Sequence, residues 1–189
     1  YRGIRKNTPL VIEPKIDGVA LALVYQSGEL QRAYTRSGRD VTRYALEVPD
    51  IPLSVPRYGK FTVRGELYAF NEHAPKSQRI AAAQLRKIQP DCHLLSFVAF
   101  QILNSQNDHK DNLKELTKLD FRVVPYVEAN SYEEIKKCHN DWLDGRFFES
   151  NYFTFLPTDG IVVKINSRSI QKQLGQSTRC PLWAVALKG

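Results

Sequence analysis

The chain of 189 residues is 42% hydrophobic and 25% charged, the balance of a folded globular protein, and this excludes a disordered chain. No apolar run approaches the roughly 18 residues that a membrane-spanning helix needs, and no secretory signal stands at the start, so we expect no membrane partner and a cytoplasmic location. The formal net charge of +7 favours a polyanionic partner, a nucleic acid or a nucleotide, over a neutral small molecule.

The three cysteines, Cys92, Cys138 and Cys180, stand far apart and form no Cys-x-x-Cys pair. They predict reduced thiols in an intracellular protein, with neither a disulfide framework nor a zinc site. Because the chain begins at Tyr1 and contains no methionine, we expect it to be a piece of a longer protein. Its length fits one large domain or two small ones.

Hydrophobic periodicity and turn signals predict mainly antiparallel strands with inserted helices, an α+β fold without internal repeats. A polar lead-in covers residues 1–9. The predicted strands begin at residue 11 and then cover 19–25, 30–36, 60–69, 94–103, 121–127, 159–165 and 183–188. The predicted helices cover 77–88, 112–119, 131–143 and 169–174. An aromatic-rich connection is expected over 147–156.

Local signals support several of these elements. The turn pair Ser27-Gly28 between two apolar segments predicts a β-hairpin over residues 19–36. Ser131, with Glu134 three residues later, forms a capping box that opens a helix. Gly65 lies within a predicted strand, where it is weakening unless another part of the chain approaches its backbone.

Charged side chains stand at or near the ends of five predicted strands. One of them, Lys15, is the candidate nucleophile. It lies in Glu13-Pro14-Lys15-Ile16-Asp17-Gly18, at the mouth of the predicted hairpin. A lysine amine is nucleophilic only when unprotonated, and burial or neighbouring cations favour that form. Any one such charge is usually a solvated rim residue. Five in one chain predict a common site.

The chain contains five motifs in the order in which they occur in nucleotidyltransferases, and their residues resemble those of the bacterial NAD-dependent DNA ligases. They are Lys15-x-Asp17-Gly18, Thr35-Arg36-x-Gly38, Arg64-Gly65-Glu66, Asp159-Gly160-Ile161-Val162-Val163-Lys164 and Trp183-Ala184-Val185-Ala186-Leu187-Lys188. Each motif alone is weak, but the ordered set is specific and covers nearly the whole chain. The resemblance implies a nucleotidyltransferase core of the ATP-grasp-like ligase type, with two antiparallel sheets, flanking helices and a nucleotide cleft between them.

The resemblance also implies the chemistry. Lys15 would attack the α-phosphate of NAD to form lysyl-AMP, AMP would pass to the 5′-phosphate of a nick in double-stranded DNA, and the 3′-hydroxyl would seal it. Asp17 would support the reacting groups or magnesium, and Asp159 is the predicted Mg²⁺ ligand. The implied nucleotide-binding residues are Glu13 and Phe100 at the adenine, Ile16 beside the nucleophile, Glu66 at the ribose, Arg36 at the ribose or the nick phosphate, and Lys164 and Lys188 at the phosphates. Phe100 could equally be a core strand residue.

The resemblance runs from about Leu10 to Lys188, and we expect residues 1–189 to form a single adenylation domain that is a monomer. We expect the family's nicotinamide-gripping piece to precede this chain, and its oligonucleotide-binding, zinc, helix-hairpin-helix and terminal domains to follow it. Two departures stand out: the loop after Arg36 is shorter than in the family, and the helix carrying Arg79 and Arg86 lacks the family's glycine.

Three other interpretations stay open on the sequence. An ATP-dependent polynucleotide ligase or a capping guanylyltransferase shares the lysine motif. A non-catalytic module could bind nucleic acid through a basic groove, and its binding would survive the loss of Lys15. A degenerate paralogue could bind adenosine only as a regulatory ligand.

Overall fold

The computed structural model describes residues 8–70, 76–146, 156–178 and 180–189. Its strands are β1 (Leu10–Ile16), β2 (Val19–Gln26), β3 (Glu29–Thr35), β4 (Lys60–Ala69), β5 (Leu95–Ile102), β6 (Val127–Ala129), β7 (Thr158–Ile165) and β8 (Ala184–Lys188). Its helices are α1 (Thr42–Ala45), α2 (Ser77–Gln84), α3 (His109–Lys118), α4 (Tyr132–Leu143) and α5 (Arg168–Leu174), with a 3₁₀ turn over Cys92–Leu94.

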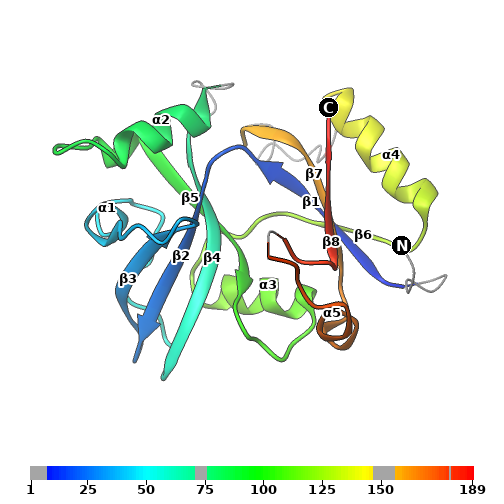
Figure 1. Cartoon of the computed structure of the whole chain (residues 1–189), viewed down its shortest axis with the longest axis horizontal. Helices are drawn as coiled ribbons and strands as arrows, with labels where there is room; N and C mark the ends of the chain where they lie inside the picture. Colours follow the sequence, from blue (N-terminus) through cyan, green and yellow to red (C-terminus); the bar gives the residue numbers. More distant parts are fainter. Residues whose placement is uncertain (1–7, 71–75, 147–155, 179) are drawn as a thin grey trace.

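The strands form two four-stranded antiparallel sheets, as the sequence predicted. One sheet has the order β3-β2-β4-β5 and the other β6-β1-β7-β8. Figure 1 shows the two sheets next to each other, and the chain passes from one to the other between β1 and β2. Lys15 lies near the end of β1, so it stands where the chain leaves one sheet for the other.

The larger core belongs to the β3-β2-β4-β5 sheet. Tyr25 and Phe97 are fully buried there, and Leu113 and Leu116 of α3 pack into the same cluster. Gly65 of β4 also faces this core, because a Cβ at that position would lie 2.2 Å from the ring of Phe97. The expected close approach to this glycine is therefore confirmed.

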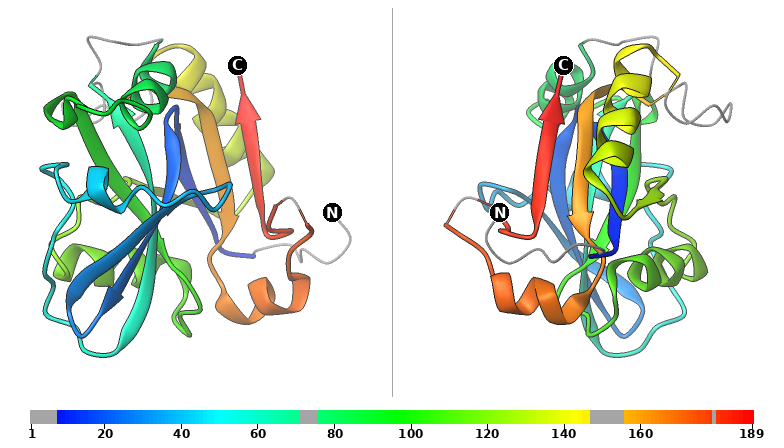
Figure 2. Two further views of the ribbon diagram at one scale, coloured as in Figure 1. Left: turned by 60° about the vertical axis from the view of Figure 1, so that its left-hand side comes forward. Right: turned by 90° about the vertical axis from the view of Figure 1, so that its right-hand side faces the viewer.

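A smaller core lies between the other sheet and α4. Ile135 and Trp142 of the helix pack against Ile12, Ile161 and Val163 of the strands, and the right-hand view of Figure 2 shows α4 over this sheet. Trp142 Nε1 also donates a hydrogen bond to Thr158 Oγ1 at 2.9 Å. This contact joins the helix to the first residue of β7.

The turn and cap signals are confirmed. Ser27 and Gly28 both have positive φ, 51° and 88°, which suits the tight turn between β2 and β3. The Ser131 side chain accepts a hydrogen bond from the Glu134 N–H at 3.2 Å. Glu134 returns its bond to the N–H of Asn130 rather than to Ser131.

Three predicted elements were wrong in extent. The predicted strand over 121–127 does not form: Val123 makes only an isolated bridge with Ala99, the chain then crosses to the other sheet, and only Val127 belongs to a strand, β6. Helix α2 ends at Gln84 instead of residue 88. The short helix α1 was not expected, and α3 begins three residues before its predicted start.

The lead-in over 1–9 lies mostly outside the described residues, and the aromatic connection over 147–156 does so except at its last position. The three cysteines are free thiols, as predicted. Within the described ranges, no helix is both long and apolar enough to cross a membrane.

Candidate active site

Two adjoining cavities meet at Lys15. The larger has a volume of about 910 Å³ and the smaller about 370 Å³, and both are lined by Lys15, Ile16, Arg36 and Glu66. Asp17, Asp159 and Lys188 line only the larger cavity, whereas Glu13, Phe100 and Lys164 line only the smaller one. Every site residue predicted from the sequence therefore lines at least one of the two cavities.

Lys15 and Lys188 share one carboxylate. Lys15 Nζ lies 2.6 Å from Asp159 Oδ1, and Lys188 Nζ lies 2.8 Å from Asp159 Oδ2. The three residues meet because β1, β7 and β8 are neighbours and Lys188 pairs with Gly160 across the ladder. Burial raises the pKa of the Asp159 carboxyl, but the hydrogen bonds from the two ammonium groups outweigh it and leave this pKa below its usual range.

Gly160 allows β8 to approach this point. Its φ is +154°, and a Cβ there would lie only 2.1 Å from the carbonyl oxygen of Leu187. A side chain at this position would collide with the backbone of β8. The glycine after Asp159 therefore keeps Lys188 within reach of the carboxylate.

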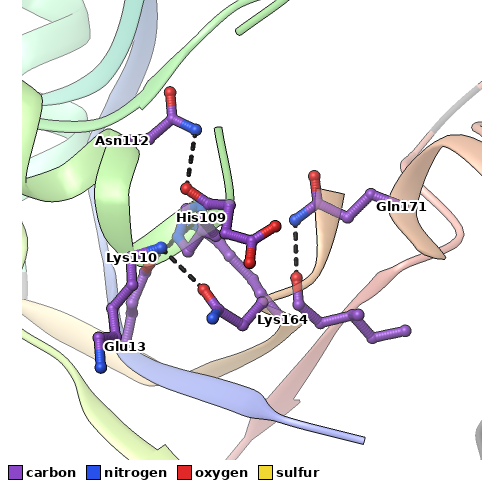
Figure 3. A network of polar contacts seen from close by, with 9 residues as sticks. Glu13, His109, Lys110, Asn112, Lys164 and Gln171 are labelled. Atoms are coloured by element: carbon purple, nitrogen blue, oxygen red, sulfur yellow. Dashed lines mark hydrogen bonds and ion pairs between the residues drawn. The ribbon is translucent and has the colours of Figure 1, made fainter. Parts of the chain in front are cut away.

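A second polar cluster lies at the smaller cavity. Glu13 uses one carboxylate oxygen for Lys164 Nζ and the other for His109 Nε2. In the β1–β7 ladder Val11 stands opposite Lys164, so Glu13 and Lys164 are diagonal neighbours on one face. Figure 3 shows the cluster, in which Glu13 comes from β1, His109 from α3 and Lys164 from β7.

Sequence reasoning missed His109. No motif contains it, and 96 positions separate His109 from Glu13. The pKa of the His109 imidazole is lowered, chiefly by burial and then by the charge of Lys164, although Glu13 acts in the opposite direction. Its position at the start of a helix carried no signal that it would reach a strand so distant in the chain.

Phe100 lies at the border between the larger core and the smaller cavity, and its contact with adenine stays a prediction. It is partly buried against the larger core, and it also lines the smaller cavity. Lys164 Nζ lies 4.9 Å from its ring centroid and the Arg64 guanidinium 5.9 Å. The ring therefore lies beside two cationic side chains.

Glu66 lies between the cavities and is surrounded by charges. Burial raises the pKa of its carboxyl to about 7, with Lys15 and Arg64 opposing the shift and the nearby Asp17 and Asp159 adding to it. This carboxyl therefore changes its protonation close to neutral pH. A neutral form can donate a hydrogen bond as well as accept one.

The larger cavity has a basic side formed by the loop after β3 and by α2. Arg36, Arg39 and Arg86 line it, and Arg39 donates a hydrogen bond to the carbonyl oxygen of Leu85 at 2.6 Å, which ties the loop to the end of α2. Arg79, the other arginine flagged in this helix, is not among the lining residues. Such a side suits an anionic group.

The acids of the site do not make a metal cage by themselves. The described part of the chain contains no group of three or more His, Cys, Asp or Glu side chains placed to hold a metal ion. Mg²⁺ needs no such group, since it binds through one or two carboxylates together with phosphate oxygens and water. Asp159 and Asp17, which line the same cavity, fit that donor set.

Comparison with known proteins gives matches over nearly the whole chain. A DNA ligase of Halothermothrix orenii is 31% identical over 204 residues, which cover 94% of this chain and 30% of that protein. A DNA ligase of Fervidobacterium nodosum is 33% identical over 214 residues, which cover 99% of this chain and 31% of that protein. The chain thus spans about 30% of the length of these relatives.

Solved structures share the fold at low sequence identity. A structure from work on Lig E DNA ligases has a TM-score of 0.59 at 15% identity, covering all of this chain and 64% of that one. A mycobacterial DNA ligase D complexed with ATP has a TM-score of 0.55 at 18% identity, covering 97% and 55%. An archaeal ATP-dependent RNA ligase also reaches 0.55, at 16% identity and with coverage of 96% and 43%.

The family model described as the NAD-dependent DNA ligase adenylation domain matches residues 2–189. The match contains the lysine motif, the carboxylate that joins Lys15 to Lys188 and both cavities. The chain belongs to the family of NAD-dependent DNA ligase adenylation domains.

Proposed function

We propose that this chain is the adenylation core of an NAD-dependent DNA ligase and that Lys15 carries the AMP. The observation that carries this proposal is the position of Lys15 at the junction of two cavities, one lined by an aromatic ring and a buried carboxylate and the other by lysines and arginines. A nucleotide needs the same pair of environments, one for its base and one for its phosphates.

The smaller cavity takes the adenosine in this proposal. Phe100 supplies a ring on which the base stacks, and Glu13 and Lys164 supply an acceptor and a donor side by side. The Watson–Crick edge of adenine presents the complementary pair, an amino donor at C6 and an acceptor at N1. Glu66, at the junction of the cavities, is placed for the ribose hydroxyls.

The larger cavity takes the phosphates. Lys188 and Arg36 line it, and both are cations that compensate phosphate charge. A bound phosphate would compete with Asp159 for the ammonium groups of both Lys188 and Lys15. Mg²⁺ held by Asp159 and Asp17 would supply further positive charge at the phosphates.

The bond changes follow from this placement. Lys15 Nζ loses a proton and forms a bond to the α-phosphorus of NAD, while the bond from that phosphorus to the bridging oxygen breaks and nicotinamide mononucleotide leaves. The AMP is then transferred to the 5′-phosphate of a nick, which frees Lys15. The 3′-hydroxyl attacks that phosphate and AMP departs. Positioning and charge compensation carry these steps, since phosphoryl transfer needs little acid–base chemistry from the protein.

The remaining partners belong to the whole protein, of which the relatives suggest this chain is one part. We propose nicked double-stranded DNA as the substrate, in keeping with the net charge of +7 and with the arginines along the larger cavity. The nicotinamide half and the encircling of DNA are assigned to other domains. We propose that the adenylating unit acts as a monomer in the cytoplasm.

An intact-mass measurement tests the proposal. The chain is incubated with Mg²⁺ and either NAD or ATP, in parallel with Lys15→Ala and with Lys110→Ala as a matched surface-lysine control. We expect a mass increase of one AMP with NAD in the native chain and in Lys110→Ala, and none in Lys15→Ala. Lys110 pairs with Glu128 and lines neither cavity, so its loss leaves the site intact.

Two results would count against the proposal. A gain of AMP from ATP alone would move the chain to the ATP-dependent ligases. A chain that gains no AMP from either nucleotide, but still binds DNA in a salt-dependent manner after Lys15→Ala, would be a nucleic-acid-binding module without catalysis.

A further inference from the structure

The proposed reaction gives no role to His109, although this buried side chain contacts Glu13, which lines the smaller cavity. Its exposed fraction is 2% and that of the Glu13 side chain is 3%. Its Nε2 atom contacts Glu13 Oε1, and Lys164 Nζ lies 3.5 Å from the same nitrogen. A buried polar side chain that reaches a binding residue directly is placed to control that residue (Figure 3).

The neighbours of His109 determine its tautomer. Glu13 is ionised and can only accept a hydrogen bond, and the ammonium of Lys164 can only donate one. Burial and Lys164 both lower the pKa of the imidazole, so the ring is neutral and carries one proton. Placing that proton on Nε2 satisfies Glu13. With the proton on Nδ1, a lone pair would face the carboxylate.

Helix α3 holds the ring in this position. The His109 N–H donates to the carbonyl oxygen of Asn166 at 2.9 Å, and the Lys110 N–H donates to the Asn166 side chain at 2.8 Å. Asn166 directly follows β7, which carries Lys164. Two hydrogen bonds therefore join the start of α3 to the residue that follows the strand bearing Lys164.

The Nε2 proton has a consequence for Glu13. Burial alone raises the pKa of a carboxyl, and at Glu13 the charge of Lys164 and the contact with His109 overcome that effect and lower it. An ionised Glu13 presents only acceptors to the cavity, which suits the C6 amino group of adenine. A protonated Glu13 could instead donate a hydrogen bond to the C6 oxygen of hypoxanthine or guanine, and it would then bind a 6-oxopurine.

We propose that His109 is a positioning residue that holds Glu13 as a hydrogen-bond acceptor and thereby makes the site select 6-aminopurine over 6-oxopurine nucleotides. This inference rests on the proposed function, which places the base in the smaller cavity. His109 acts through Glu13 and does not itself touch the base. A site built around one pattern of donors and acceptors rejects the inverted pattern, because its buried groups would be left unpaired.

The test is equilibrium binding of AMP and IMP to the full chain at pH 7.5, measured by titration calorimetry. We expect the native chain to prefer AMP. His109→Ala should weaken AMP binding by about tenfold while affecting IMP much less, because one hydrogen bond to a charged group is lost. His109→Gln, whose amide N–H can reach Glu13, should restore most of the preference.

Asn112→Ala is the matched structural control. Asn112 is buried one turn along α3 and donates to the carbonyl oxygens of Asn107 and Asp108 at 3.0 and 3.1 Å, without an observed bond to Glu13. Its loss should lower the melting temperature and leave the ratio of AMP to IMP affinity unchanged. Glu13→Gln, which offers a donor in place of one acceptor, should shift the ratio toward IMP even if the His109 variants do not fold.

The outcomes separate this inference from the proposed function. A native chain without a preference for AMP, or a His109→Ala variant that keeps the native ratio, overturns the inference whether or not Lys15 is adenylated. An Asn112→Ala variant that changes the ratio as much as His109→Ala also overturns it, because the effect would then be structural. Loss of preference in His109→Ala with restoration in His109→Gln supports it, even if no lysyl-AMP forms and the proposed function fails.

Discussion

Asp159 binds two ammonium groups, and this arrangement defines the site at the scale of single residues. Each oxygen of this carboxylate contacts one lysine, Oδ1 contacting Lys15 and Oδ2 contacting Lys188, and each still has a lone pair for another ligand. Because Lys15 Nζ is bound to Asp159, it has to leave this contact before it can attack a phosphorus atom.

Asp159→Asn should separate catalysis from stability. The pair is partly exposed, so its loss should cost only about 0.5–1 kcal/mol of unfolding free energy. The rate of lysyl-AMP formation should fall by at least about a hundredfold, because Lys15 and Lys188 lose the group that holds them together. Urea denaturation and timed mass spectra measure the two quantities. An unchanged rate would remove Asp159 from the reaction.

Glu66 makes stability depend on pH. Its folded pKa of about 7 lies above the ordinary value of 4.5, so between these values the folded state binds more protons than the unfolded state. Stability should therefore be greatest below about pH 4.5 as far as this group is concerned, and fall as the pH rises to about 7, by up to about 3 kcal/mol.

Glu66→Gln removes this titration and should be the more stable protein at pH 8, with a smaller difference at pH 5. Unfolding free energies of the two proteins at both pH values check the prediction. A difference that is the same at pH 5 and pH 8 would contradict the raised pKa. The variant should also bind AMP more weakly if Glu66 contacts the ribose.

Most of the proposed site residues could be named from the sequence because they belong to short, contiguous motifs, and the structure shows that they line the two cavities. Their roles in binding stay predictions. It could not locate His109, whose role depends on a contact between α3 and β1 across 96 positions. Nor could it show that Lys164 pairs with Glu13, because that contact depends on the register of β1 against β7. Residue types come from local sequence, whereas their partners come from strand pairing.

At the scale of elements, the position of β8 depends on a glycine in the neighbouring strand, and the start of α4 is stabilised by its N-cap residue. Gly160 lets the backbone of β8 approach β7 closely, and Ser131 satisfies an N–H at the first turn of α4. The strand predicted over 121–127 does not form, because most of its residues have no strand to pair with. Its apolar residues pack against the larger core, but only Val123 finds a bridge, and β6 forms later, beside β1.

Gly160→Ala should displace β8. The added Cβ would meet the Leu187 carbonyl oxygen, so β8 must shift and carry Lys188 away from Asp159. We expect a loss of about 2 kcal/mol or more in unfolding free energy and a strong loss of adenylation. Gly145→Ala is the matched control, because Gly145 also has a positive φ, 72°, but nothing lies within 4 Å of its Cβ position. Equal effects at both glycines would show that backbone strain, not the collision, is responsible.

Ser131→Ala should weaken α4 without touching the chemistry. Removing an N-cap side chain costs about 1 kcal/mol. Since α4 packs on the sheet through Ile135 and Trp142, the loss should appear as a lower melting temperature with an unchanged adenylation rate. A reduced rate at a temperature where the variant is folded would mean that α4 also controls the site.

At the scale of the whole molecule, two antiparallel sheets supply residues to both sides of the proposed nucleotide site. β1, β7 and β8 carry Lys15, Asp159 and Lys188 from one sheet, while β4 and β5 carry Glu66 and Phe100 from the other. The two-sheet architecture was predicted from the motif order. The pairing of β1 with β6 and β7 could not be read from periodicity, because these partners lie more than 100 residues away.

The central claim is that Lys15, and no other lysine of the site, receives the AMP. After incubation with NAD and Mg²⁺, the protein is digested and the adenylated peptide is sequenced by tandem mass spectrometry, with Lys15→Arg as the comparison. The account predicts a single phosphoramidate on Lys15 and none in Lys15→Arg. AMP found on Lys164 or Lys188, or adenylation that persists in Lys15→Arg, would contradict it.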